Sequence, residues 1–116
     1  MALNDRELQR YLQRVSDRWA IERALVGGAR VDDLHGAPPQ RERGPEFVVV
    51  LVSSGFDGVP WLERVHQAGS LWDALEMGDR AEVHCYTPPE MERKVAQLPR
   101  VRRVAERGVE LALEPA

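Results

Sequence analysis

The chain has 116 residues, of which 43% are hydrophobic and 30% charged, and this length suits one domain spanning residues 1–116. A net charge of −3 argues against a generally basic surface for DNA, and the lone cysteine, Cys85, excludes an internal disulfide and any multi-cysteine metal site. No apolar run approaches the about 20 residues of a membrane-spanning helix, and the first residues lack a signal-peptide pattern, so we expect a cytoplasmic protein with no membrane partner.

The N-terminal segment predicts an amphipathic helix. Asn4 can cap it, and Glu7 follows three residues later, as in a capping box. Apolar residues then recur at helical spacing, at Leu8, Tyr11, Leu12, Val15 and Trp19. From about Ile21 the pattern alternates, which predicts a short strand ending at Gly27-Gly28, although a helix continuing to Val26 is the competing interpretation.

The middle of the chain predicts a loop followed by a central strand. Residues 29–45 are polar and rich in proline and glycine, which favours a short helix at most and then a long loop. The run Phe47–Val52 is apolar and mostly β-branched, which is typical of a strand buried on both faces. We therefore expect a strand in the middle of a sheet covered by helices, with Val48 buried.

Helical spacing returns after Pro60, which suits the first turn of a helix. Gly69-Ser70 interrupts this helix and Gly78 ends it. Trp61 and Trp72 are predicted to be core residues of this region.

The last third of the chain predicts a strand, two helices and an edge strand. Residues 81–86 alternate, with Cys85 on the apolar face as an inert buried thiol. Thr87-Pro88-Pro89-Glu90 is a helix start with a cap and a capping-box glutamate. Pro99 begins the next predicted helix, which Gly108 ends, and residues 109–114 alternate as an edge strand. The whole order predicts an α/β or α+β domain, a small mixed sheet with helices packed on it.

Four features, taken in order, resemble the small bacterial nucleotidyltransferase domains of the DNA polymerase β superfold. The stretch 17–31, with Gly27-Gly28, is similar to the family's strand and Gly-Ser turn. Residues 46–52 resemble the strand where the family carries an Asp-x-Asp pair. Residues 81–94 resemble its strand and Thr-Pro-Glu-Glu helix, and residues 101–111 its last helix, Glu-Gly turn and terminal strand.

The resemblance implies nucleotidyl transfer as the family's chemistry. Two carboxylates at i and i+2 of one strand face the same side and hold divalent metals, which orient a triphosphate. The Gly-Ser turn offers hydrogen-bond donors to the phosphates, and a third carboxylate on a neighbouring strand helps to activate the acceptor hydroxyl.

This chain departs from the family at its catalytic positions. The first aspartate position falls on Glu46, the second on Val48, and the third on Glu82, or on His84 if the register slips by two. Valine has no oxygen with which to bind a metal. The phosphate-binding turn falls on Gly27 and Gly28, which keep the backbone donors and lose the hydroxyl. We therefore expect Glu46 and Glu82 to be vestigial catalytic residues and no metal site to remain.

Three hypotheses about function follow. The first is a catalytically degenerate nucleotidyltransferase-like protein that binds or regulates a partner. The resemblance implies an antitoxin-like role opposite a helical HEPN-type protein; a homodimer is the alternative partner. The second is an active enzyme that transfers AMP, using magnesium and ATP with Glu46 and Glu82, and with Asp32 or Asp33 as a further candidate carboxylate. The third is a small α/β protein-interaction domain unrelated to nucleotidyl transfer. Only the second needs a cofactor, and none of them predicts binding to DNA.

Overall fold

The computed structural model describes residues 3–36 and 44–113, so the middle of the predicted long loop lies outside the described residues. The strands are β1 (Arg23–Gly27), β2 (Phe47–Val52), β3 (Ala81–Tyr86) and β4 (Val109–Glu110). The helices are α1 (Asp5–Ser16), α2 (Ala29–Leu34), α3 (Trp61–Ser70), α4 (Ala74–Met77), α5 (Pro88–Gln97) and α6 (Pro99–Arg107), with a short 3₁₀ turn, η1 (Ser54–Phe56). The predicted class is confirmed: the fold is α+β, with helices packed on a mixed sheet.

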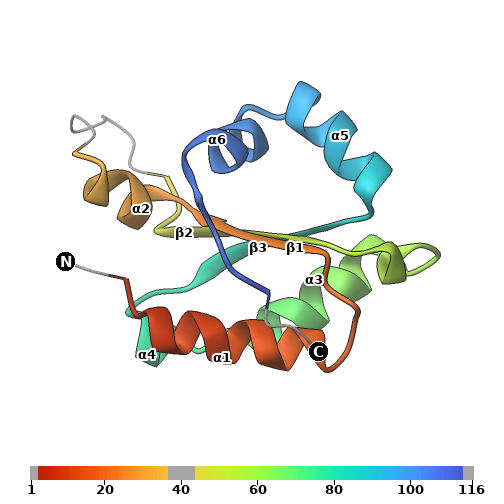
Figure 1. The fold of residues 1–116 in the computed structure, drawn as a ribbon, viewed down its shortest axis with the longest axis horizontal. Coiled ribbons are helices and arrows are strands. Elements are labelled where there is room, and N and C mark those ends of the chain that lie inside the picture. Colours follow the sequence, from red (N-terminus) through yellow and green to blue (C-terminus); the bar gives the residue numbers. More distant parts are fainter. Residues whose placement is uncertain (1–2, 37–43, 114–116) are drawn as a thin grey trace.

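The four-stranded sheet has the order β3-β2-β1-β4. Strand β2 pairs with β3 in parallel and with β1 in antiparallel orientation, and β1 pairs with β4 in antiparallel orientation. Helices α5 and α6 cover one face of this sheet, and α1, α3 and α4 cover the other (Figure 1). The prediction of a central strand buried on both faces is confirmed, because all six residues of β2 are buried.

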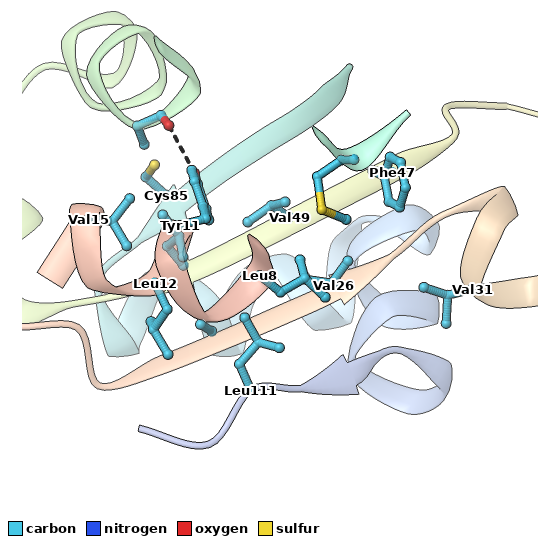
Figure 2. Packing of buried hydrophobic residues seen from close by; sticks show 14 of the residues in the cluster. Leu8, Tyr11, Leu12, Val15, Val26, Val31, Phe47, Val49, Cys85 and Leu111 are labelled. Carbon is cyan, nitrogen blue, oxygen red and sulfur yellow. Dashed lines mark hydrogen bonds between the residues drawn. The ribbon is translucent and has the colours of Figure 1, made fainter. Parts of the chain in front are cut away.

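Each face of the sheet has its own hydrophobic core. On the α1 face, alternate residues of the strands meet the apolar stripe of α1, and the Tyr11 hydroxyl donates a hydrogen bond of 2.9 Å to the Ala68 carbonyl (Figure 2). Cys85 lies in this core, where burial raises the pKa of its thiol to about 12. On the α5–α6 face, Val48 and Val50 pack beneath Val101 and Val104 of α6. The period of two along β2 therefore supplies both cores.

Several local predictions are confirmed and two are corrected. The segment after α1 forms a strand, not a continued helix, and Thr87 and Glu90 form the predicted capping box. Trp72 packs against the α1-side core, but Trp61 is 41% exposed at the start of α3, so its prediction as a core residue is wrong. It stacks instead on Tyr86 of β3, with ring centroids 5.4 Å apart. The predicted edge strand is shorter than expected, since β4 contains only Val109 and Glu110.

A buried arginine joins the two helical layers across the outer edge of β3. Arg64 of α3 is only 7% exposed, and its Nε donates to the Val59 carbonyl at 2.7 Å. Its Nη1 donates to the Cys85 carbonyl at 3.2 Å and to Oε1 of Glu90 at 2.8 Å. Because Glu90 also accepts the Thr87 backbone N–H, the capping box of α5 is tied to α3. The charge of Arg64 is thus paired and hydrogen-bonded, as burial requires.

The Glu90 network predicts a pH-dependent stability. Burial raises the pKa of Glu90, but hydrogen bonds from Thr87 and the Arg64 guanidinium outweigh it and hold the pKa below its usual value of 4.5. A depressed pKa in the folded state means that the stabilisation is present above pH 4.5 and is lost as the pH falls through the folded value. We expect Glu90→Gln to lower the free energy of unfolding by about 1 kcal/mol at pH 7.

Urea unfolding of both proteins between pH 7 and pH 3 checks this expectation. The difference between wild type and Glu90→Gln should shrink toward the acid end, whereas a difference that does not depend on pH would contradict it. The matched control is Glu92→Gln on the same helix, because Glu92 is exposed and has no ion pair among the described residues. That change should alter stability by less than about 0.5 kcal/mol.

Candidate functional site

The register of the sheet places side by side the positions that the sequence resemblance matches to the family's catalytic residues. Val48 on β2 pairs with Gly27 on β1 and with Glu82 on β3. The side chains of paired residues point to the same face, so Val48 and Glu82 share the α5–α6 face at the end where β2 begins. Glu46 stands two residues before Val48, immediately ahead of the strand. The sequence positions matched to the family are therefore brought into one region.

A cleft of about 420 Å³ lies beside the paired residues Gly27, Val48 and Glu82, between α2, the beginning of β2 and α6. Its lining combines the buried side chains of Val48 and Val104 with the half-exposed arginines Arg100 and Arg103. The other described residues that line it are Gly27, Gly28, Ala29, Asp32, Gly44, Pro45, Pro99 and Gly108. Neither Glu46 nor Glu82 is among them. The cleft thus has an apolar part and a cationic rim on α6.

The two glycines have close packing contacts. A Cβ atom on Gly27 would lie 2.8 Å from Cγ2 of Val104, so α6 packs directly on this point of β1. Gly28 has φ +105°, and a Cβ there would lie 2.7 Å from the Glu46 carbonyl oxygen. The next two backbone N–H groups, of Ala29 and Arg30, already donate to the carbonyls of Pro45 and Glu46. These two N–H groups therefore hold the start of α2 against the segment that leads into β2. Phosphate binding by Gly27 and Gly28 stays a prediction.

Three carboxylates around the cleft are each held by an arginine. Glu82 accepts two hydrogen bonds from Nη1 of Arg100, at 3.0 and 2.9 Å. Glu46 accepts one from Nε of Arg30 at 2.8 Å, and this guanidinium also lies over the ring of Phe47. Asp32 of α2, which lines the cleft, accepts one from Nε of Arg103 at 3.1 Å. Guanidinium groups thus stand where a metal-dependent site needs open carboxylate oxygens.

The residues at the matched positions do not fit a divalent cation. Val48 supplies no oxygen ligand, and the carboxylates of Glu46 and Glu82 are engaged by Arg30 and Arg100. Within residues 3–36 and 44–113, no group of three or more histidine, cysteine, aspartate or glutamate side chains is placed to hold a metal.

His84 lies one step further along the same face of β3. Its Nδ1 is 2.7 Å from the Tyr86 hydroxyl and its Nε2 is 3.3 Å from Glu82 Oε1. Burial lowers the pKa of His84, although the neighbouring Glu82 carboxylate acts in the opposite direction. Burial therefore favours the neutral imidazole, which packs between Glu82 and Tyr86.

Sequence reasoning underrated the arginines. From the sequence alone, Arg100, Arg102, Arg103 and Arg107 predict a solvated helix face, with an acidic partner or RNA as the alternative use. The structure directs Arg100 to Glu82 and Arg103 to Asp32, while Arg102 donates to the Val95 and Ala96 carbonyls and so caps the end of α5. The spacing of three and four residues between Arg100, Arg103 and Arg107 is the one signal that places them on a common side of the helix.

The chain was compared with protein-family models, with curated proteins and with solved structures, and none of them matches it. Among the described residues, no helix is long and apolar enough to cross a membrane.

Proposed function

We propose that this protein is a nucleotidyltransferase-like binding module without transferase activity. The observation that carries the proposal is the row Gly27–Val48–Glu82, in which a buried valine takes the place of the second metal-binding aspartate. The sequence resemblance matches these positions to the family's catalytic residues. The register of β1, β2 and β3 supports the proposal, because the matched positions are neighbours in space.

The arginine pairs support loss of catalysis over the active alternative. An enzyme that used Glu46 and Glu82 would need both carboxylates free to bind the same metal ions. Here they are drawn to different guanidinium groups, and Asp32 is held by a third. Each of these pairs balances a carboxylate charge that a metal balances in an active site. The cleft lies beside the row Gly27–Val48–Glu82, and Arg100 and Arg103 of α6 form its cationic rim.

Such a module acts by binding a partner, and we propose an antitoxin-like role on the basis of the sequence resemblance. A helical protein of the HEPN type is the partner that the resemblance implies. The target of such a module is another protein or a second copy of this chain. Copurification from the native host would identify that partner.

Calorimetric titration with ATP in the presence and absence of magnesium tests the proposal. We expect no heat of binding that depends on magnesium. The Arg100→Ala variant sharpens the test, because it frees the Glu82 carboxylate while Val48 still supplies no ligand. This variant should also show no magnesium-dependent binding. Tight metal-dependent ATP binding by the wild type would contradict the proposal and favour the active enzyme.

A further inference from the structure

One side of α6 carries a row of arginines whose ligand the proposed function leaves open. Arg100, Arg103 and Arg107 are spaced three and four residues apart, which puts them on one flank of the helix over about 10 Å. Arg100 and Arg103 line the cleft, and Arg107 is exposed with no ion pair among the described residues. Helix α6 lies on the outside of its face of the sheet (Figure 1). We call these three residues the arginine row.

The two helices α5 and α6, which carry the arginine row, locally reverse the sign of the net charge of the chain. Residues 88–107 hold six basic and three acidic side chains, in a protein whose net charge is −3. The Arg100–Glu82 pair is exposed, with 52% and 36% of the two side chains accessible, whereas the Arg103–Asp32 pair is part-buried, with 41% and 19% accessible. An exposed pair is worth little, so a partner's carboxylate can replace Glu82 on Arg100 at low cost. Arg103 binds Asp32 through Nε, and a guanidinium has further N–H donors for a second carboxylate.

The chemistry of the cleft favours carboxylates over nucleic acid. The guanidinium groups already bind carboxylates here, and Arg100 reaches both oxygens of Glu82. The described lining contains no aromatic side chain on which a base would stack, and its accessible apolar part, Pro45 and Pro99, suits an aliphatic side chain. Three arginines are also fewer than the about 6–10 phosphate contacts of a DNA-binding protein whose affinity depends strongly on salt.

We infer that the cleft and the arginine row bind an acidic segment of a partner protein, with its carboxylates on Arg100, Arg103 and Arg107 and an aliphatic side chain in the cleft. This inference rests on the proposed function, because it takes the cleft as a binding surface, and it adds the chemistry of the partner. The salt bridges are screened by ions, so the affinity falls as the salt concentration rises.

The probe for the test is a fluorescein-labelled peptide of ten glutamates with one central leucine, and binding is followed by fluorescence anisotropy. The test variant is Arg100→Gln/Arg103→Gln/Arg107→Gln. The control, Arg6→Gln/Arg80→Gln/Arg93→Gln, changes the net charge equally, and its three arginines are exposed and make no ion pair within the described residues. Circular dichroism establishes that both variants are folded; if the test variant is not, Arg107→Gln alone replaces it.

We expect the wild type and the control to bind the peptide, and the test variant to bind about tenfold more weakly. Arg107→Gln alone should weaken binding about twofold to threefold. Equal binding by the test and control variants, or no binding by the wild type, would overturn the inference. A single-stranded oligothymidylate that binds more tightly than the peptide would also overturn it, in favour of nucleic acid. Each of these outcomes leaves the magnesium–ATP titration unaffected, so the two proposals fail separately.

Discussion

Replacing Val48 by aspartate is expected to lower the free energy of unfolding by about 3–5 kcal/mol at pH 7. Val48 is 2% exposed, lies between β1 and β3 and packs in the core under α6. An aspartate there is an uncompensated buried charge, and the carboxylate of Glu82, on the paired residue of β3, adds repulsion. Placing a carboxylate at this position by a single substitution therefore destabilises the fold.

Chemical denaturation of Val48→Asp and Val48→Thr measures the free energy of unfolding of each variant and so separates the effect of the buried charge from the effect of the added polar group. Threonine keeps the size of valine and adds a neutral hydroxyl, so Val48→Thr should cost about 1–3 kcal/mol. Burial raises the pKa of the aspartate in the folded state, so its cost should be full above that pKa and smallest in acid. A nearly neutral Val48→Asp would mean that this position faces an open cleft and that part of an active site survives.

Gly28→Ala is the second change with a large expected effect, about 3 kcal/mol or more of destabilisation. The φ of +105° at Gly28 is in the region that favours glycine, and the added Cβ would lie 2.7 Å from the Glu46 oxygen and 2.9 Å from the Phe47 Cα. Both neighbours are backbone atoms, which cannot rotate away. The substitution would force β2 away from the start of α2 and open the cleft.

The matched control for Gly28→Ala is Gly69→Ala. Gly69 lies within α3, and a Cβ there would have no atom within 4 Å. Alanine is a better helix former than glycine, so Gly69→Ala should stabilise the protein by up to about 1 kcal/mol. Thermal or urea unfolding of the two variants should give changes of opposite sign. Equal, small effects would show that the turn at Gly28 tolerates a side chain.

Features encoded within a few neighbouring residues could be predicted from the sequence. The six apolar residues of β2 can be buried only in the middle of a covered sheet, and the capping box at Thr87 and Glu90 depends on a spacing of three residues. The alternation along β3 likewise assigned Cys85 to a buried face.

Features that depend on the arrangement of distant segments could not be predicted. Trp61 has the apolar character of a core residue, but α3 begins at the edge of the sheet, where the ring is covered on one side by Tyr86. The pair between Arg103 and Asp32 joins residues 71 positions apart. The residues next to Arg103 in the sequence do not indicate a pair with Asp32, and the same holds for the residues next to Asp32. The sequence pattern therefore predicts a solvated surface for the arginines of α6.

The measurement that tests the central claim most directly is transfer of label from ATP labelled at the α-phosphate, in the presence of magnesium, to this protein or to any protein that copurifies with it. We expect no incorporation in either protein, because the site beside Val48 does not hold the two metals of nucleotidyl transfer. Incorporation by the wild type that is lost in Glu82→Gln would contradict the account and show that the row Gly27–Val48–Glu82 belongs to a working enzyme.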